Sequence, residues 1–319
     1  MRFSALSNLP VISASYAASV ASGRPLVWGM PPAVGIELTN YCNLSCPECH
    51  TGSGAGTRTR GFIDPALFRK IIDELKPWLL NINLYFQGEP MMHPRFFDLL
   101  ELSSGINTTL STNGHFLSEE NVRALAASKL GTIIVSLDGM TEETYSKYRV
   151  GGHFFKVVDG IRKLADEVRR SGSPLRVKIQ FLVNRYNEHQ IADLKNFARE
   201  HGAGVILKSM QVISADAHAD WMPEMPAFKR YENSTGIYML RSRLSDRCAR
   251  LWFNPVITWD GKVLPCCFDK DGDHVMGDLT KTDFRTTWHG KTFNAFRSSL
   301  LEARKEIRMC TNCTSGLKT

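Results

Sequence analysis

The chain has 319 residues, of which 43% are hydrophobic and 22% are charged, and its formal net charge is +7. This length and composition are those of one large α/β domain, alone or with a small appendage, around an ordinary core. No apolar run approaches the roughly 20 residues of a transmembrane helix. Basic residues are spread along the chain, so the charge suits an anionic substrate or partner, and no nucleic-acid surface is expected.

The first segment, residues 1–33, is predicted to be an N-terminal helical arm. Met1-Arg2-Phe3 followed by an apolar stretch faintly resembles a signal peptide, but Pro10, Ser13 and Ser15 interrupt that stretch. We therefore expect residues 1–30 to form a helix or arm packed on the outside of the domain. The eight cysteines stand at metal-ligand spacings in a long, core-rich chain, which favours a reducing cytoplasm over a disulfide framework.

Between residues 34 and 215 apolar, β-rich runs alternate with amphipathic stretches. The strand candidates are Gly35–Thr39, Ile82–Phe86, Thr108–Ser111, Thr132–Ser136, Val177–Val183 and Val205–Ser209. The helix candidates are Pro65–Leu75 with Asp64 as N-cap, Pro94–Leu102, Ser118–Ala127, Phe155–Arg170 and His189–His201. Six βα repeats predict an α/β fold with a parallel sheet, a partial (βα)6 TIM-like barrel.

The remaining chain is predicted to be a linker and a small domain. Residues 216–240 are expected to form a linker over the barrel mouth, starting with the polar loop Asp216–Pro226. Residues 241–319 contain the hairpin Val256–Trp259, Asp260-Gly261, Lys262–Leu264, and then a helix over Phe293–Glu306. This part carries the other five cysteines.

Three cysteines, Cys42, Cys46 and Cys49, follow the first predicted strand in a C-x3-C-x2-C spacing. A four-iron cluster takes four thiolates, so three would leave one iron open to an outside ligand. A zinc site with His50 as a fourth ligand is the alternative, because Cys3His sites exist. The position at a strand end of an α/β fold, where reactive groups gather, favours the cluster.

Four more cysteines form a second candidate site. The hairpin brings Cys248 and Cys266 toward each other, and Cys310 and Cys313 add a C-x2-C pair. Four thiolates are a complete ligand set for either zinc or a [4Fe–4S] cluster, and a structural zinc ribbon is the alternative here. Cys267 is the odd thiol and is not assigned as a ligand.

Several motifs in order resemble those of the radical S-adenosylmethionine (radical SAM) superfamily. They are the cysteine triplet, Gln87-Gly88-Glu89-Pro90 after the second strand, and the strand ends Ser111-Thr112-Asn113-Gly114 and Ser136-Leu137-Asp138-Gly139. Gln87 stands where the family has a first Gly, and Glu48 replaces a frequent aromatic residue before the third cysteine. The C-terminal cysteines resemble an abbreviated SPASM module, called a twitch domain, whose relatives carry an auxiliary cluster.

The resemblance implies two [4Fe–4S] clusters per chain and bound SAM. Its implied SAM-binding residues are Gln87, Gly88, Glu89, Pro90, Ser111, Asn113, Ser136, Asp138, Asn184 and Lys208. Arg149 is expected to clamp a carboxylate of SAM or substrate, or else to solvate a helix end. Asp269 is a candidate general base, with a solvated loop aspartate as the alternative.

The implied activity is that of an oxidoreductase. It would cleave SAM to a 5′-deoxyadenosyl radical and oxidise a small polar substrate such as a sugar or aminocyclitol, with electrons from a flavodoxin or ferredoxin. A second hypothesis is maturation of a ribosomal peptide by crosslinking, epimerisation or decarboxylation. About 33 residues before the barrel are too few for a leader-binding module, so a separate partner would be needed. A non-catalytic zinc protein is the third.

Overall fold

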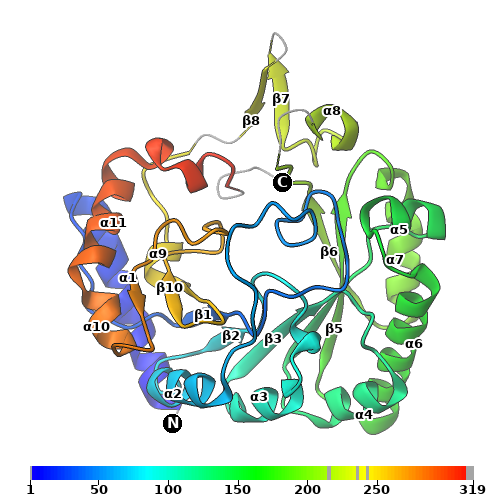
Figure 1. Ribbon diagram of the computed structural model, residues 1–319, viewed down its shortest axis with the longest axis horizontal. Coiled ribbons are helices and arrows are strands. Elements are labelled where there is room, and N and C mark those ends of the chain that lie inside the picture. Colours follow the sequence, from blue (N-terminus) through cyan, green and yellow to red (C-terminus); the bar gives the residue numbers. More distant parts are fainter. Residues whose placement is uncertain (1, 214–216, 235–236, 242–243, 314–319) are drawn as a thin grey trace. The chain divides into compact units, whose positions relative to one another are not determined.

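The computed structural model describes residues 2–213, 217–234, 237–241 and 244–313 (Figure 1). The chain divides into two compact units. Among the described residues, the first contains 2–41, 57–108 and 244–313, and the second contains 42–56, 109–213, 217–234 and 237–241. The predicted boundary at 215, the start of the predicted loop at Asp216 and the chain end to 319 lie outside the described residues, and the predicted domain limits stay predictions.

The first unit contains a mixed sheet in which β1 lies between β2 and β9. Its strands are β1 (Ala33–Ile36), β2 (Asn81–Asn83), β9 (Val256–Ile257), β10 (Lys262–Leu264) and β11 (Gly277–Asp278). β1 runs parallel to β2, with Ala33 opposite Asn81, and parallel to β9, with Gly35 opposite Val256. β9, β10 and β11 pair antiparallel, as the predicted hairpin requires. The C-terminal hairpin thus extends the sheet that β1 begins.

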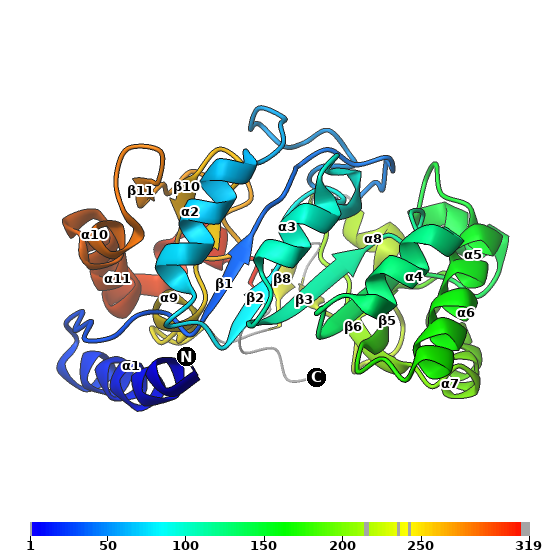
Figure 2. The ribbon, with the colours of Figure 1, turned by 90° about the horizontal axis from the view of Figure 1, so that it is seen from below.

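Helices of the first unit flank this sheet. They are α1 (Arg2–Ser22), α2 (Pro65–Leu75), η1 (Pro90–Met92), α3 (Phe96–Leu102), α9 (Arg250–Phe253), α10 (Phe284–His289), α11 (Lys291–Ala303), η3 (Arg304–Glu306) and η4 (Arg308–Cys310). Asp64 caps α2 by accepting from the amides of Ala66 and Leu67, as predicted. Figure 2 shows α2 and α3 side by side in front of β1 and β2.

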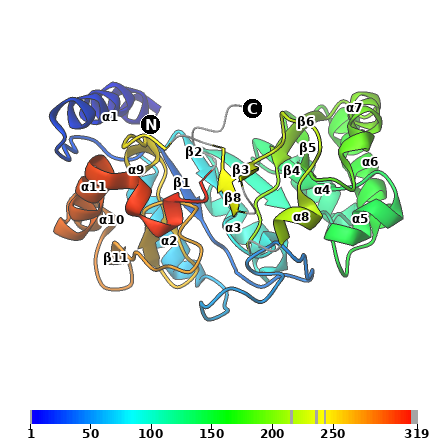
Figure 3. The same ribbon diagram turned by 90° about the horizontal axis from the view of Figure 1, so that it is seen from above.

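Buried polar side chains fix α1 to the segment that precedes β1. Asn8 bonds both backbone groups of Met30, and the hydroxyls of Ser15 and Ser19 donate to the carbonyl of Leu26. The indole of Trp252, on α9, donates to the same carbonyl. Figure 3 shows α1 next to α9. The predicted N-terminal helix is therefore a packed element of the first unit.

The second unit contains a parallel sheet of four strands. They are β3 (Asn107–Thr112, paired through residues 109–112), β4 (Thr132–Ser136), β5 (Arg176–Val183) and β6 (Gly204–Ser209). Burial alternates strictly along β5, where Val177, Ile179, Phe181 and Val183 are buried and the residues between them are not. Such alternation means that β5 is covered on one face and partly open on the other, whereas β4 is buried along its whole length.

Helices cover one face of this sheet. They are α4 (Glu119–Ala127), α5 (Glu142–Tyr148), α6 (Phe154–Ser171), η2 (Glu188–Gln190) and α7 (Ile191–Glu200), whereas α8 (Ala217–Trp221) is separate from them and packs against the cluster that contains Cys46. Figure 1 shows α5, α6 and α7 together on one side of β5 and β6. A separate antiparallel hairpin is formed by β7 (Tyr231–Ser234) and β8 (Ile237–Leu240). After this hairpin the chain returns to the first unit.

The predicted fold class is confirmed: strands alternate with helices from β1 to β6, the sheets are mostly parallel, and strands and helices follow at the C-terminus. The sequence interpretation missed α5, and it assigned to a linker the residues that form α8, β7 and β8. Short turns of helix there have too few residues for a periodic signal. In the described part of the chain, no helix is long and apolar enough to cross a membrane.

Candidate active site

The cysteine triplet lies in a loop of the second unit against an apolar cluster. Cys46 is buried with Leu44, Tyr148 and Met210, and Cys42 and Cys49 pack against the same cluster half-buried. The amide of Cys49 donates to the carbonyl of Cys46, which closes a tight turn. A side chain at Gly52 would collide with the Cys46 backbone, so a glycine is needed there. The loop therefore gathers three thiols in a largely dry environment.

Two side-chain N–H groups reach the sulfur atoms of this loop. The amide nitrogen of Asn113 is 3.9 Å from Cys42 Sγ, and Arg149 Nη1 is 3.9 Å from Cys46 Sγ. Burial raises the pKa of the Cys46 thiol to about 11, although Arg149 opposes this. Metal binding would supply the missing compensation. Thiolates with N–H donors, in an apolar pocket, are a donor set that fits a [4Fe–4S] cluster.

Arg149 and Asp138, which were predicted separately as ligand contacts, are bonded to each other. Arg149 Nε donates to Asp138 Oδ2 at 2.6 Å, and the amide of Leu182 donates to Asp138 Oδ1 at 2.6 Å. The Asp138 side chain is fully buried, whereas 14% of the Arg149 side chain is exposed. Both oxygens of Asp138 are thus engaged by the protein, and Arg149 is fixed beside Cys46.

The end of β3 is tied to the same loop through a short relay. Asn113 Nδ2 donates to the Asn43 side chain at 2.8 Å, and its Oδ1 accepts from His115 Nδ1. His115 Nε2 in turn accepts from the amide of His153. Burial lowers the pKa of His115 to about 4, so the ring is neutral with its proton on Nδ1. Asn113 therefore positions the cysteine loop.

The predicted strand-end residues differ in what they already bind. Ser111 and Ser136 sit on strands β3 and β4, Ser111 half-buried and Ser136 buried. The buried Asn184 caps its own turn by accepting from the amide of Tyr186 and donating to the carbonyl of Leu182. Lys208, near the end of β6, is exposed. Asn184 thus has a structural role in its own turn.

The Gly-Glu-Pro motif belongs to the first unit and is tightly held there. Gly88 has a φ of +70°, and a Cβ on it would lie 2.6 Å from the carbonyl oxygens of Thr39 and Tyr41. The amide of Glu89 donates to the Tyr41 carbonyl at 2.7 Å, and Glu89 Oε1 accepts from the amide of Met91. Glu89 and Gln87 are buried. This arrangement fixes a carboxylate in the segment after β2, at the start of η1, where an ammonium group would find an acceptor.

The four C-terminal cysteines are all buried in the first unit. Cys248, Cys266, Cys310 and Cys313 are each at most 8% exposed. Cys310 lies close enough to Cys313 and Cys248 for their charges to interact, and burial raises the pKa of Cys310 to about 11. Arg304 Nη2 is 3.6 Å from Cys313 Sγ. Four thiols beside a buried guanidinium fit an anionic metal centre held by thiolates.

Cys267 and Asp269 follow the hairpin and have defined partners. Arg250 Nη1 is 3.5 Å from Cys267 Sγ. A hydrogen bond with Cys266 and the charge of Arg250 lower the pKa of Cys267 to about 6. Asp269 is 2% exposed and accepts from the amides of Asp273 and His274. The alternative that Asp269 is a solvated loop residue is therefore wrong, since it organises the turn that follows Cys266.

Sequence reasoning missed Arg250, Arg304 and His115. Arg250 lies close after Cys248 in the sequence, and Arg304 lies in the short helix η3 that precedes Cys310. A cationic residue near clustered cysteines was the signal that could have identified them. His50, the alternative zinc ligand, is half-buried near the triplet. In the described ranges, no group of three His, Cys, Asp or Glu side chains is arranged to hold a single metal ion.

Two family models match separate parts of the chain. The sequence model described as "Radical SAM superfamily" matches residues 36–198, which is half of the chain. The one described as "Iron-sulfur cluster-binding domain" matches residues 248–314. The first match includes the cysteine triplet, and the second includes Cys248, Cys266, Cys310 and Cys313.

Three curated proteins illustrate the similarity. A mycofactocin maturase, MftC, of Mycobacterium ulcerans is 32% identical over 169 residues, 52% of this chain and 44% of that protein. A probable GTP 3′,8-cyclase of Methanosarcina mazei is 29% identical over 187 residues, 57% and 54% respectively. A tungsten-containing aldehyde ferredoxin oxidoreductase cofactor-modifying protein of Pyrococcus furiosus is 26% identical over 313 residues, 88% and 86%. The chain thus spans about half the length of the first two.

Solved structures share the fold at low sequence identity. BtrN in complex with AdoMet and 2-DOIA has a TM-score of 0.58 and 20% identity, over 91% of this chain and 96% of that one. Streptococcus suis SuiB bound to its precursor peptide SuiA has a TM-score of 0.66 and 16% identity, over 95% and 79%.

Proposed function

Because this chain belongs to the radical SAM superfamily, we propose that it cleaves SAM reductively and oxidises a small polar substrate, such as a sugar or aminocyclitol. When bound, the triplet's cluster and SAM supply the 5′-deoxyadenosyl radical that removes a hydrogen atom from the substrate. The protein's own task is to hold the thiolates, orient SAM and keep the site dry. The observation that carries the proposal is a loop with three thiols, one fewer than a four-iron cluster takes, in a chain with a second set of four.

We assign a [4Fe–4S] cluster to each cysteine set, two per chain. Cys42, Cys46 and Cys49 would hold the first, with Asn113 and Arg149 donating to its sulfur ligands at the distances given above. Cys248, Cys266, Cys310 and Cys313 would hold the second, beside Arg304. A second redox centre gives the electron left on an oxidised substrate a place to go, which supports a net two-electron oxidation.

The SAM contacts are proposed residue by residue. The Glu89 carboxylate and the carbonyl groups around it suit the methionyl ammonium group, and the hydroxyls of Ser111 and Ser136 suit the ribose or methionine. Asp138 and Arg149 act by position, because Arg149 engages Asp138 Oδ2 and the amide of Leu182 engages Oδ1. Asp269 is proposed as the base only if its turn opens, since two backbone amides bind it.

A second candidate is maturation of a ribosomal peptide. It is supported by the 32% identity to the mycofactocin maturase over the radical SAM half and by the fold shared with SuiB bound to SuiA. In either case a flavodoxin or ferredoxin would supply the electron. The eight cysteines form no disulfide, which is compatible with the reducing cytoplasm that we propose as the location.

The first test is iron content and SAM cleavage after anaerobic purification. Two four-iron clusters predict about eight iron atoms per chain and dithionite-dependent release of 5′-deoxyadenosine. Zinc without iron, or an iron-loaded protein that leaves SAM intact, would overturn the enzyme proposal.

Cysteine variants then separate the two sets. Replacement of Cys42, Cys46 and Cys49 by Ala should abolish SAM cleavage, whereas replacement of Cys310 and Cys313 should spare part of it and remove substrate turnover. Cys267→Ser is the matched control and should keep the full iron content. Equal loss of cleavage from both sets would contradict the division of roles. Turnover of a small polyol but of no peptide would support the small polar substrate, and turnover of a peptide alone would support the second candidate.

A further inference from the structure

Arg304 connects the segments that carry the four C-terminal cysteines. Its Nη1 donates to the carbonyl of Arg247 at 2.9 Å, one residue before Cys248, and its Nη2 lies 3.6 Å from Cys313 Sγ. Its backbone amide donates to Asp246 Oδ1 at 2.7 Å. This one residue thus ties the segment that leads to Cys248 to the C-x2-C loop that ends at Cys313.

The guanidinium group of Arg304 has no carboxylate to balance its charge. Arg304 is 2% exposed, and within the described residues its side chain makes no ion pair with an Asp or Glu and no contact with an aromatic ring. A buried charge is costly unless an anion and hydrogen-bond partners replace water. The anions within reach are thiolates, since Cys248, Cys310 and Cys313 all lie close enough for their charges to interact with Arg304.

The Nε–H group of Arg304 points to a further acceptor. It is buried, and no protein atom is in hydrogen-bonding geometry with it, although the Cys310 thiol lies near the guanidinium. Buried donors are almost always paired, so an unpaired one among thiols calls for an acceptor that the thiols alone do not supply. The sulfur atoms of a bound iron-sulfur cluster would be such acceptors.

Arg297, on α11, is also buried, but its charge is compensated in another way. Its guanidinium lies over the rings of Phe293 and Trp288, 3.8 and 4.2 Å from their centroids, and its Nε donates to the carbonyl of Leu251. Aromatic faces stabilise a cation without an anion. Although Nη2 of Arg297 is unpaired as well, no thiolate charge reaches this residue. Of these two buried arginines, only Arg304 faces thiolates.

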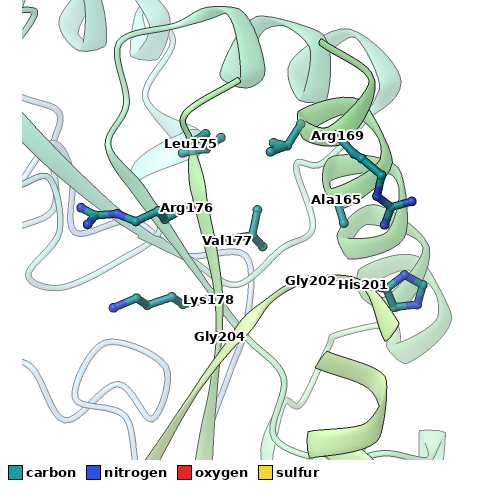
Figure 4. Close-up of a pocket in the computed structure, with 10 residues that line it drawn as sticks. Ala165, Arg169, Leu175, Arg176, Val177, Lys178, His201, Gly202 and Gly204 are labelled. Atoms are coloured by element: carbon teal, nitrogen blue, oxygen red, sulfur yellow. The ribbon is translucent and has the colours of Figure 1, made fainter. Parts of the chain in front are cut away.

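The basic side chains around the pocket beside β5 do not form a comparable site. Figure 4 shows Val177 directed toward Ala165 of α6, on the covered side of the strand. Arg176 and Lys178 project to the other side of β5, and both are at least partly exposed. Water can therefore solvate these cations, and their surroundings do not require an anion as those of Arg304 do.

We infer that Arg304 donates a hydrogen bond from Nε to a sulfur atom of the cluster held by the four C-terminal cysteines and raises the reduction potential of that cluster. The inference rests on the proposed function, because it takes these four thiols to hold a four-iron cluster. An N–H donor and a positive charge next to the sulfur atoms stabilise the reduced, more negative cluster, so both properties of Arg304 act in the same direction.

The first test measures the potential of this cluster alone. Full-length protein with Cys42, Cys46 and Cys49 replaced by Ala is purified anaerobically, and a redox titration is followed by electron paramagnetic resonance. Arg304→Gln should lower the midpoint potential by at least about 59 mV, which is a tenfold change in a one-electron equilibrium. Arg304→Lys keeps the charge but not the Nε–H group, and its potential should lie between the other two. Arg308→Gln, at an exposed arginine, should leave the potential unchanged.

The second test detects the hydrogen bond itself. Protein labelled with ¹⁵N-arginine is reduced, and the coupling of ¹⁵N nuclei to the electron spin of the cluster is recorded. We expect a coupling in the parent protein that Arg304→Lys removes and Arg308→Lys retains. The parent spectrum needs no variant to assemble, so the absence of any ¹⁵N coupling there overturns the inference. An iron-loaded Arg304→Gln protein with the parent potential also overturns it.

Iron and zinc contents are measured on every preparation, and SAM cleavage is measured on protein with an intact triplet. Zinc in place of iron would overturn the proposed function and the inference with it. Full iron content and SAM cleavage with an unchanged potential in Arg304→Gln would overturn only the role of Arg304.

Discussion

The guanidinium of Arg149 binds the buried carboxylate of Asp138 and also lies 3.9 Å from Cys46 Sγ. Asp138 follows β4, and Arg149 follows α5, whose start is fixed by the capping box of Thr141. The pair therefore connects the end of a central strand to the cysteine loop. Since Leu182 of β5 donates to the same carboxylate, this single buried charge orders three segments.

Arg149→Gln should destabilise the protein by about 3–5 kcal/mol, because it leaves the Asp138 charge buried without its partner. Anaerobic urea denaturation of the iron-loaded protein measures this loss. Arg169→Gln is the control, since its ion pair with Asp166 has both side chains about two-thirds exposed and should contribute no more than about 1 kcal/mol. Similar losses in the two variants would mean that the buried pair is not a structural anchor.

The same substitution should lower the midpoint potential of the cluster held by the triplet. A cation and an N–H donor next to a sulfur ligand favour the reduced, more negative cluster, so their removal disfavours reduction. Redox titration followed by electron paramagnetic resonance, with Cys310 and Cys313 replaced so that one cluster is observed, gives the potential. An unchanged or higher potential in Arg149→Gln would show that Arg149 does not act on the cluster.

His115 should make the stability of the protein depend on pH between about 4 and 6.5. Its pKa is lowered from 6.5 to about 4 by burial, so the unfolded chain takes up a proton in this range and the folded protein does not. The contribution of neutral His115 is thus complete above pH 6.5 and is lost as the pH falls toward 4. Urea denaturation from pH 4 to 8 should show a shallower decline for His115→Gln. His189→Gln, at an exposed histidine, should keep the wild-type slope.

Local signals predicted most elements of the fold, because short-range chemistry fixes them. Thr132–Ser136 is a strand within its predicted limits, and Asp64 and Pro65 begin α2 as predicted. The first strand ends earlier than expected, at Ile36. Beyond it, Leu38 and Thr39 pair with the returning segment at Phe62 and Ile63 rather than with the sheet. The signal for α5 was present in Thr141-Glu142-Glu143, a cap followed by acidic residues.

The ligand residues were found from spacing, but their surroundings were not. Nothing in the sequence near Asp138 indicates that Arg149 will engage it, and nothing near Cys267 indicates Arg250, which is 17 positions earlier. These contacts depend on how distant segments meet, so a motif can name a residue without revealing whether the protein already uses it. Asn184 illustrates this. Its side-chain nitrogen donates to the carbonyl of Leu182 and its side-chain oxygen accepts from the amide of Tyr186, so both atoms that could bind a ligand already have partners in its own turn.

Gly88→Ala should cost far more than an alanine at another left-handed glycine. Both Gly88 and Gly172 have positive φ values, +70° and +65°, and the strain of that conformation is about 1–2 kcal/mol. A Cβ at Gly172 meets no atom within 4 Å, whereas at Gly88 it would meet backbone oxygen atoms at 2.6 Å. Thermal unfolding should therefore place Gly88→Ala well below Gly172→Ala. SAM binding, measured by equilibrium dialysis, should weaken only in Gly88→Ala. Equal effects of the two changes would contradict the tight fit of this turn.

Arg58→Met should leave a second buried charge, the carboxylate of Glu37 in the first unit, without its partner. Arg58 binds Glu37, which follows β1, through both terminal nitrogens at 2.8 and 2.6 Å, and its Nε donates to the carbonyl of Lys270. Glu37 is fully buried, so loss of its partner should cost about 3–5 kcal/mol at neutral pH. The double variant Arg58→Met with Glu37→Gln should recover much of this, since it removes the uncompensated charge.

The pH dependence of Arg58→Met distinguishes this explanation from simple loss of packing. Burial already raises the pKa of Glu37 in the native protein, and removal of Arg58 raises it further. A carboxyl group with a raised folded-state pKa binds its proton more tightly when folded, so stability falls as the pH rises through that pKa. Arg58→Met should therefore be less destabilised at pH 5 than at pH 8, relative to wild type at each pH. A loss of stability that does not change with pH would show that packing of the Arg58 side chain, and not its charge, provides the stabilisation.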